Sequence, residues 1–174
     1  MLYPMKFHPV YKDYIWGGRN LAKFGKQLPE GIVAESWELS CHVDGMSIVK
    51  NGVFEGRTLK SMIEEYGNEI MGDLAGKYTD FPLLIKLIDA NEKLSVQVPD
   101  DEFARFHEGD NGKNEMWYIL DAKPGAQLIY GLKHGVSRED FEKAVKENRV
   151  EDCLNYINVK AGDFINIHAG LVHA

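Results

Sequence analysis

Cysteines and long apolar runs are both scarce in this sequence, and each shortage excludes a class of protein. The two cysteines, Cys41 and Cys153, lie far apart and form no CxxC pair, so we expect reduced thiols rather than disulfides. No apolar run approaches the roughly 20 residues of a bilayer-spanning helix. Residues 1–14 also lack the basic, apolar and small-residue order of a secretory signal. We therefore expect a cytoplasmic protein with no membrane partner.

Positive charge is also in short supply. The sequence has 20 lysines and arginines against 27 aspartates and glutamates, a formal net charge of −7. Proteins that bind the nucleic-acid backbone usually carry clustered cations, so nucleic acid is not expected as a partner. A small anionic substrate remains compatible, because it needs only two or three local cations. With 174 residues, ordinary globular composition and no repeat or linker, the chain fits one domain.

Short alternating segments predict a mostly β chain with a few helices. Residues 36–41 alternate with Trp37, Leu39 and Cys41 on one side, and residues 81–88 form a continuous apolar run that suits a buried strand. Thr58 is expected to cap a helix that ends at Gly67, and Ser137 to open another with Asp140 as capping partner. Further strands are expected at 47–49, 94–98, 113–120, 127–130 and 164–167, and short helical pieces at 70–74 and 152–156.

Two isolated features admit both a structural and a functional interpretation. Lys86 interrupts the apolar run 81–88; it either extends outward along its aliphatic stem or presents a cation to a pocket. Trp16 precedes Gly17 and Gly18, where an aromatic ring either covers one end of the sheet or lines a substrate pocket.

The segment 94–118 combines two strands whose polar residues share a face. Alternation places Leu94, Val96 and Val98 in the core, and Ser95 and Gln97 on the opposite face. Pro99 follows and begins a helical turn, and His107 lies in a loop that we expect at the surface. The return strand places Lys113, Glu115 and Trp117 on one face.

A distant segment, residues 162–174, ends in His173 after a turn of small residues. Antiparallel strands that bring Gln97, Glu115 and His173 together suit a zinc-type site with nitrogen and oxygen ligands. An apolar binding barrel with a polar rim accounts for the same residues.

Several runs carry a family resemblance over nearly the whole chain: WGGRNL, ESWELS, LIKLIDANEKLSVQV, PDDEFA, GKNEMWYIL and VKAGDFINIHAGLVHA. In order and spacing they resemble the type I phosphomannose isomerases of the short bacterial form, which are cupin β-barrels of the jelly-roll kind. The resemblance implies a metal-dependent aldose-ketose isomerase that interconverts mannose 6-phosphate and fructose 6-phosphate through an enediol.

The resemblance also implies roles for particular residues. The family binds one zinc ion through residues that correspond to Gln97, Glu115 and His173. Lys113 shares a strand face with Glu115 and is a candidate for proton transfer or oxyanion stabilisation, and Lys86 is the second catalytic candidate. Ser95, a neighbour of Gln97 on the expected pocket face, is a candidate for binding the phosphate, and Trp16 for lining the substrate pocket.

Three departures from the family pattern bear on these expectations. The family reads QVHPDDE where this chain reads QVPDDE over residues 97–102, as though one residue were deleted, so the QxH histidine has no counterpart and Pro99 offers no ligand atom in its place. His168 stands where the family usually has proline. Family members continue beyond the position of Ala174 through further barrel strands and a substrate arginine. We therefore expect residues 1–174 to form a single cupin-type domain that is truncated before the last barrel strands, so that either the sequence is incomplete or other material completes the sheet.

The missing ligand keeps a second class of function open, a non-catalytic sugar-binding or regulatory cupin. A metal-dependent oxygenase barrel is a third reading, but it requires two histidines and one carboxylate, which the sequence does not offer without the QxH pair.

Overall fold

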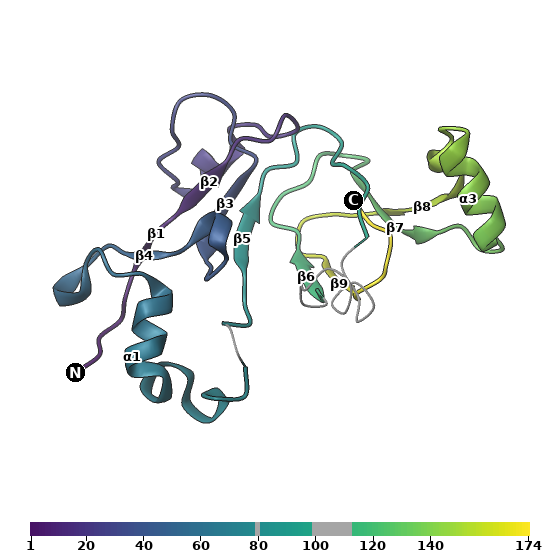
Figure 1. Ribbon diagram of the computed structural model, residues 1–174. Coiled ribbons are helices and arrows are strands. Elements are labelled where there is room, and N and C mark those ends of the chain that lie inside the picture. The colour runs from purple at the N-terminus through teal and green to yellow at the C-terminus, as the bar shows by residue number, and fades with distance from the viewer. Residues whose placement is uncertain (79–80, 99–112) are drawn as a thin grey trace. The chain divides into compact units, whose positions relative to one another are not determined.

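The computed structural model describes residues 1–78, 81–98 and 113–174. The chain forms two compact units, Met1–Lys93 (unit 1) and Leu94–Ala174 (unit 2), and each is described by itself. Figure 1 follows the chain through them, from purple in unit 1 to yellow at the end of unit 2. Within the described ranges, no helix has both the length and the apolar character that a membrane span requires.

Unit 1 is built on short antiparallel strands. A central sheet has the order β2-β3-β5, and a smaller one pairs β1 with β4. The strands are β1 (Phe7–His8), β2 (Val10–Lys12), β3 (Glu35–Leu39), β4 (Ile48–Val49) and β5 (Ile85–Ile88). The helices are α1 (Leu59–Met71) and the 3-10 turns η1 (Asn20–Phe24), η2 (Val43–Gly45), η3 (Gly52–Phe54) and η4 (Gly72–Leu74).

Helix α1 begins where the sequence predicts and ends later. The Thr58 hydroxyl accepts a hydrogen bond from the Ser61 amide at 3.1 Å, which confirms the predicted cap. The predicted end at Gly67 is wrong, because the helix continues to Met71 across a kink at Tyr66, where φ is −120° and ψ is 23°. Leu59 and Met62 turn inward and are buried, as the apolar spacing predicted.

The expected buried strand over residues 81–88 is only partly present. Strand β5 takes Ile85–Ile88 alone, and Leu83 and Ile85 are 56% and 50% exposed. The prediction of an eight-residue buried strand is therefore wrong in extent. In the sheet order β2-β3-β5, strand β5 pairs only with β3 and lies at an edge, which leaves part of its apolar surface uncovered within unit 1.

Unit 2 contains two ribbons, β6 (Glu115–Tyr118) with β9 (Phe164–Ile167) and β7 (Gln127–Leu132) with β8 (Leu154–Asn158). Helix α3 (Arg138–Lys146) and the turn η5 (Val150–Cys153) connect β7 to β8, and Figure 1 shows α3 at the far end of that ribbon. Ser137 and Asp140 form the complete capping box that the sequence predicted. The short helical piece expected near 152–156 is present but lies earlier, because η5 covers Val150–Cys153 and β8 begins at Leu154.

The strand predicted over residues 94–98 does not form as a ladder. Its pairing consists of one bridge between Gln97 and His173, and Val96 and Val98 are 40% and 54% exposed instead of buried. A single bridge fixes one residue and does not press the flanking valines into a core. They line an open surface pocket of about 270 Å³ beside Phe141 and Val145 of α3.

The predicted fold class, mostly strands with few helices, is confirmed. The described strands form ribbons of two or three members, and residues 1–78, 81–98 and 113–174 contain no closed barrel. Pro99, the turn after it and His107 lie outside the described residues.

Candidate metal centre

The candidate centre lies at the C-terminal residues of unit 2, whose backbone is hydrogen-bonded to two other segments of the unit. The backbone N–H of Gln97 donates to the backbone carbonyl of His173 at 3.0 Å, and the backbone N–H of His173 donates to the backbone carbonyl of Gln97 at 2.8 Å. On the other side, the Gly131 amide of β7 donates to the Val172 carbonyl at 2.7 Å, and the Ile129 amide donates to the Ala174 carbonyl at 2.8 Å. The backbone of His173 is thus held from both sides, and this fixes the origin of its side chain.

His173 is fully buried, with none of its surface exposed. Its Nδ1 lies 3.0 Å from the Leu171 carbonyl oxygen. Because a carbonyl oxygen only accepts, Nδ1 carries a proton, which leaves Nε2 as the ring nitrogen available to a metal. The Trp117 ring packs edge-on against the imidazole, with centroids 5.4 Å apart. A histidine fixed through Nδ1 by a carbonyl is the usual arrangement of a histidine that binds a metal through Nε2.

The Nε2 atom of His173 faces two oxygen-bearing side chains. It lies 3.7 Å from Glu115 Oε1 and 3.1 Å from the amide nitrogen of Gln97. The Gln97 amide therefore donates to the imidazole lone pair. Turning the amide by half a rotation would present its oxygen in the same direction at little steric cost, since the two groups are nearly the same size.

Glu115, on β6, is the acidic residue of the cluster. The side chains two residues before it and two residues after it hold its carboxylate. The Trp117 indole donates to Oε2 at 2.8 Å, and Lys113 Nζ lies 2.7 Å from Oε1. The second contact is an ion pair rather than a directed hydrogen bond, because buried Oε1 has no partner in hydrogen-bond geometry among the residues that the structure describes. Burial by itself raises the pKa of Glu115, but the Lys113 ammonium and the hydrogen bond from the Trp117 indole outweigh it and hold the pKa below its usual value.

These residues fit a zinc ion. A buried carboxylate oxygen with no hydrogen-bond partner among the described residues, an imidazole nitrogen 3.7 Å from it and an adjacent amide supply the nitrogen and oxygen ligands that zinc accepts. In the described part of the chain, no three histidine, cysteine, aspartate or glutamate side chains form a metal cluster. The third candidate ligand here is an amide, so the cluster is recognised through Gln97.

The sequence-derived candidates divide between the two units. Unit 2 brings together Gln97, Glu115, His173 and Lys113, whereas Ser95 lies exposed in the segment before Gln97. His168 is exposed as well, and its Nε2 lies 3.3 Å from the Asn166 amide. Sequence reasoning placed Trp117 on the correct face without a role, and nothing in the sequence indicated the carbonyl of Leu171.

Lys86 and Trp16 belong to unit 1. Lys86 Nζ lies 2.9 Å from the buried carboxylate of Glu35 on β3. The Trp16 ring is half-buried and stacks on Tyr14 at 5.5 Å, and its carbonyl accepts hydrogen bonds from the amides of residues 91 and 92. Gly17 permits this loop to lie against β3, because a Cβ there would approach the Ala34 Cα to 2.5 Å.

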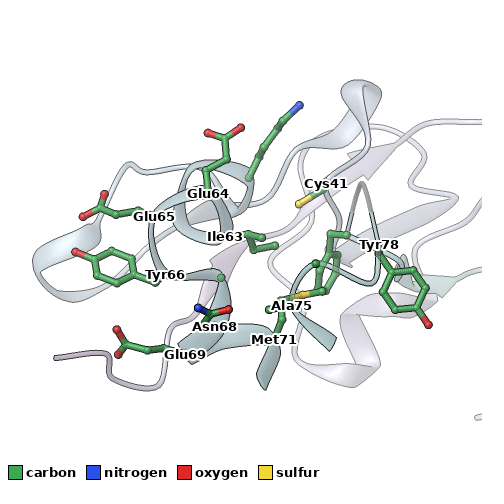
Figure 2. A pocket seen from close by; sticks show the side chains of 14 residues that line it. Cys41, Ile63, Glu64, Glu65, Tyr66, Asn68, Glu69, Met71, Ala75 and Tyr78 are labelled. Atoms are coloured by element: carbon green, nitrogen blue, oxygen red, sulfur yellow. The ribbon is translucent and has the colours of Figure 1, made fainter. Parts of the chain in front are cut away.

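A surface pocket of about 450 Å³ also lies in unit 1, along α1. In Figure 2, the side chains of Ile63, Met71 and Cys41 gather on one side of the helix, and those of Glu65 and Glu69 extend on the other. Three carboxylates and one ammonium line this pocket, those of Glu64, Glu65, Glu69 and Lys60. The excess of negative charge disfavours a phosphorylated sugar there.

The comparisons with known proteins agree on one family. Residues 5–127 match the model of the phosphomannose isomerase type I catalytic domain. The mannose-6-phosphate isomerase ManA of Bacillus subtilis is 40% identical over 173 residues, which are 98% of this chain and 54% of that protein. The crystal structure of the mannose 6-phosphate isomerase from Bacillus subtilis matches with a TM-score of 0.88 and 38% identity, over 99% of this chain and 55% of that one.

A more distant structure, a zinc-bound mannose 6-phosphate isomerase, matches with a TM-score of 0.71 and 16% identity, over 97% of this chain and 64% of that one. At this identity the similarity concerns the fold. The chain spans about half the length of the curated relatives that it matches. With more than two thirds of its residues in the family match, the chain belongs to the type I phosphomannose isomerase family.

Proposed function

We propose that this chain carries part of the active site of a mannose-6-phosphate isomerase, which interconverts mannose 6-phosphate and fructose 6-phosphate through an enediol. Relatives named for this activity match nearly the whole chain. The observation that carries the proposal is the buried Oε1 of Glu115, which has no hydrogen-bond partner among the described residues and faces Nε2 of His173 at 3.7 Å. We also propose a cupin-type barrel for the complete domain and a cytoplasmic location.

The cofactor in this proposal is one zinc ion, held by Gln97, Glu115 and His173. A zinc-bound structure of similar fold supports the choice of metal. Such an ion supplies Lewis-acid polarisation of substrate oxygens. The expected fourth protein ligand, the QxH histidine, has no counterpart in the sequence, so this chain would bind zinc with three protein groups and leave other positions to solvent or substrate.

The remaining candidates account for the proton transfer. Isomerisation moves a proton between C1 and C2 and develops negative charge on the enediolate, so it requires a proton carrier and a nearby cation. Lys113 Nζ is held 2.7 Å from Glu115 Oε1 and its side chain is 44% exposed, which leaves it accessible to a substrate at this centre. We assign proton transfer or oxyanion stabilisation to Lys113, with Lys86 as the second such group. Ser95 is assigned to the phosphate and Trp16 to the pocket wall.

The test combines metal content with turnover of the purified protein. We expect one zinc per chain by mass spectrometry and conversion of mannose 6-phosphate, lost after chelation and restored by zinc. Protein without zinc or turnover that still binds the sugar phosphate in calorimetry would instead be a non-catalytic sugar-binding module.

A pair of matched variants tests the role of Lys113. Lys113→Met should lower turnover by at least about 100-fold, in the range of general acid-base contributions, while zinc stays bound. Lys123→Met changes an exposed lysine of the same unit and should leave turnover unchanged. Turnover of Lys113→Met equal to that of Lys123→Met would remove Lys113 from the mechanism.

A further inference from the structure

A buried carboxylate in unit 1 forms a cluster that the proposed function does not use. Glu35, the first residue of β3, is 5% exposed, and both of its oxygens accept hydrogen bonds. The Trp37 indole donates to Oε2 at 2.7 Å, and the Lys86 ammonium donates to Oε1 at 2.9 Å. Burying a carboxylate costs free energy, and hydrogen bonds and a counter-ion such as these offset that cost.

Strand pairing brings the three side chains together. Alternation along β3 places Glu35 and Trp37 on one face. In the antiparallel register with β5, Trp37 lies opposite Lys86 and Glu35 opposite Ile88. Lys86 is therefore the diagonal neighbour of Glu35, close enough for a long side chain to reach. The ammonium crosses from an apolar edge strand to a carboxylate on the central strand.

The indole that anchors Glu35 is itself immobilised. Trp37 is 8% exposed, and the His42 ring packs edge-on against it at 5.8 Å. Lys12, the last residue of β2, places its Nζ 4.6 Å from the centroid of the Trp37 ring. The turn at Gly45 presses on the ring so closely that a Cβ there would lie 2.3 Å from Trp37 Cε3. The position of the indole determines that of the carboxylate, and the carboxylate determines that of Lys86.

Unit 2 contains the same arrangement of side chains around Glu115. There too a glutamate accepts from the indole two residues later, at 2.8 Å, and holds a lysine, Lys113, at 2.7 Å. The two clusters differ in the second oxygen. Oε1 of Glu35 accepts a hydrogen bond from Lys86, whereas Oε1 of Glu115 has no hydrogen-bond partner among the described residues, forms an ion pair with Lys113 and faces His173. Both carboxylates hold a lysine, and that of Glu115 also lies beside a histidine.

We infer that Glu35 is a positioning residue for Lys86, which it holds in one place through a carboxylate fixed by the Trp37 indole. The inference rests on the proposed function, because it matters for the reaction only if Lys86 acts in it. Stability alone accounts poorly for the pair, because a buried ion pair is often no more stabilising than apolar residues of similar size. The Lys86 side chain is 20% exposed, so part of it remains accessible although its counter-ion is buried.

The first test needs no isomerase activity. Acylation of lysine requires a free, neutral amine, so the rate at each lysine, followed by mass spectrometry, reports how firmly its ammonium is held. In Glu35→Gln, which keeps the shape of the side chain, acylation of Lys86 should rise about tenfold, since charge-assisted hydrogen bonds are roughly twice as strong as neutral ones. The rate at Lys113 in unit 2 is the internal reference and should stay unchanged.

Two further variants sharpen this readout. Trp37→Phe removes the indole donor and keeps the carboxylate, so acylation of Lys86 should rise by a smaller factor than in Glu35→Gln. Glu115→Gln is the matched control in the other cluster, and it should raise acylation at Lys113 and leave Lys86 unchanged. Acylation of Lys86 in Glu35→Gln within twofold of the original protein would overturn the inference and leave the proposed function standing.

Kinetics of the zinc-loaded protein then separate positioning from folding. Glu35→Gln should lower kcat by about 100-fold, the lower end of the range for proton transfer by a positioned group, with KM, zinc content and melting temperature near those of the original protein. Lys86→Gln keeps a donor to Glu35 and should lower kcat by at least as much. Full activity in Lys86→Gln would remove Lys86 from the proposed function and overturn the positioning inference with it, even if acylation responded to Glu35.

Discussion

Replacing Glu115 with glutamine should separate metal binding from folding in unit 2. The amide occupies the same volume as the carboxylate, and its oxygen can still accept from the Trp117 indole, now at 2.8 Å. What is lost in the metal-free protein is the ion pair to Lys113, whose side chain is 44% exposed and therefore screened. Exposed pairs contribute about 0–1 kcal/mol, so the free energy of unfolding without metal should change by no more than about 1 kcal/mol.

The zinc-bound protein should respond much more strongly to the same change. Loss of the charged ligand should weaken zinc binding by about 100-fold, or about 2.7 kcal/mol. At free zinc near 1,000 times the original Kd, binding stabilises the original protein by about 4.1 kcal/mol and the variant by about 1.4 kcal/mol. A chain of 174 residues shifts its melting temperature by about 2–4 °C per kcal/mol. The rise in Tm on adding zinc should therefore shrink by roughly 7 °C.

The assay is thermal unfolding of chelator-treated protein with and without buffered zinc, together with the zinc retained after dialysis. Glu139→Gln, an exposed change on α3, is the control and should behave as the original protein does. Retention of stoichiometric zinc and an unchanged zinc-dependent rise in Tm would show that Glu115 is not a ligand. A large loss of stability without metal would instead assign Glu115 a structural role.

Three further predictions concern the framework of the two units. Leu154→Ala empties a fully buried position on β8 and should cost about 2–5 kcal/mol of unfolding free energy in urea titrations. Lys86→Met leaves the Glu35 carboxylate buried without its cation and should cost about 3–5 kcal/mol, most of which the added change Glu35→Gln should restore; a double variant no more stable than the single one would contradict the pairing. Hydrogen bonds from the Ser137 hydroxyl and backbone amide lower the pKa of Asp140 in the folded helix. Protonation of the Asp140 carboxylate therefore favours the unfolded helix. Hydrogen-exchange protection of α3 should hold above about pH 4 and decline as pH falls through the folded-state pKa. Asp140→Asn should abolish that dependence.

The parts of the fold that the sequence predicted well are those fixed by local chemistry. Thr58 and Ser137 cap their helices because a hydroxyl oxygen satisfies free amides of the first turn wherever the helix packs. Strand β9 has the predicted bounds 164–167, since Ile165 and Ile167 alternate with exposed residues and are both buried. The pair Glu115 and Trp117 was placed on one face by the same alternation.

Errors arose where burial depends on a partner strand. The apolar run 81–88 and the valines at 96 and 98 have strand composition, yet β5 has one neighbour and Gln97 one bridge. Hydrophobic pattern reports what a segment can bury, whereas the number of neighbours decides how much it does bury. The convergence of Gln97 with His173 survives this error, because it depends on that one bridge and not on a complete ladder.

The environment of Lys86 shows why the anchor of a charged group is hard to predict from its own segment. A lysine within an apolar run either extends outward or points into a pocket, and neither alternative names a counter-ion. The counter-ion is Glu35, 51 positions away in the sequence and adjacent only through the register of β3 with β5. The clue lies on the other strand, where a glutamate precedes a tryptophan by two residues and both face the core. Because the same pattern at Glu115 and Trp117 also holds a lysine, a glutamate paired with a tryptophan on one strand face marks, in this chain, the place where an ammonium is held.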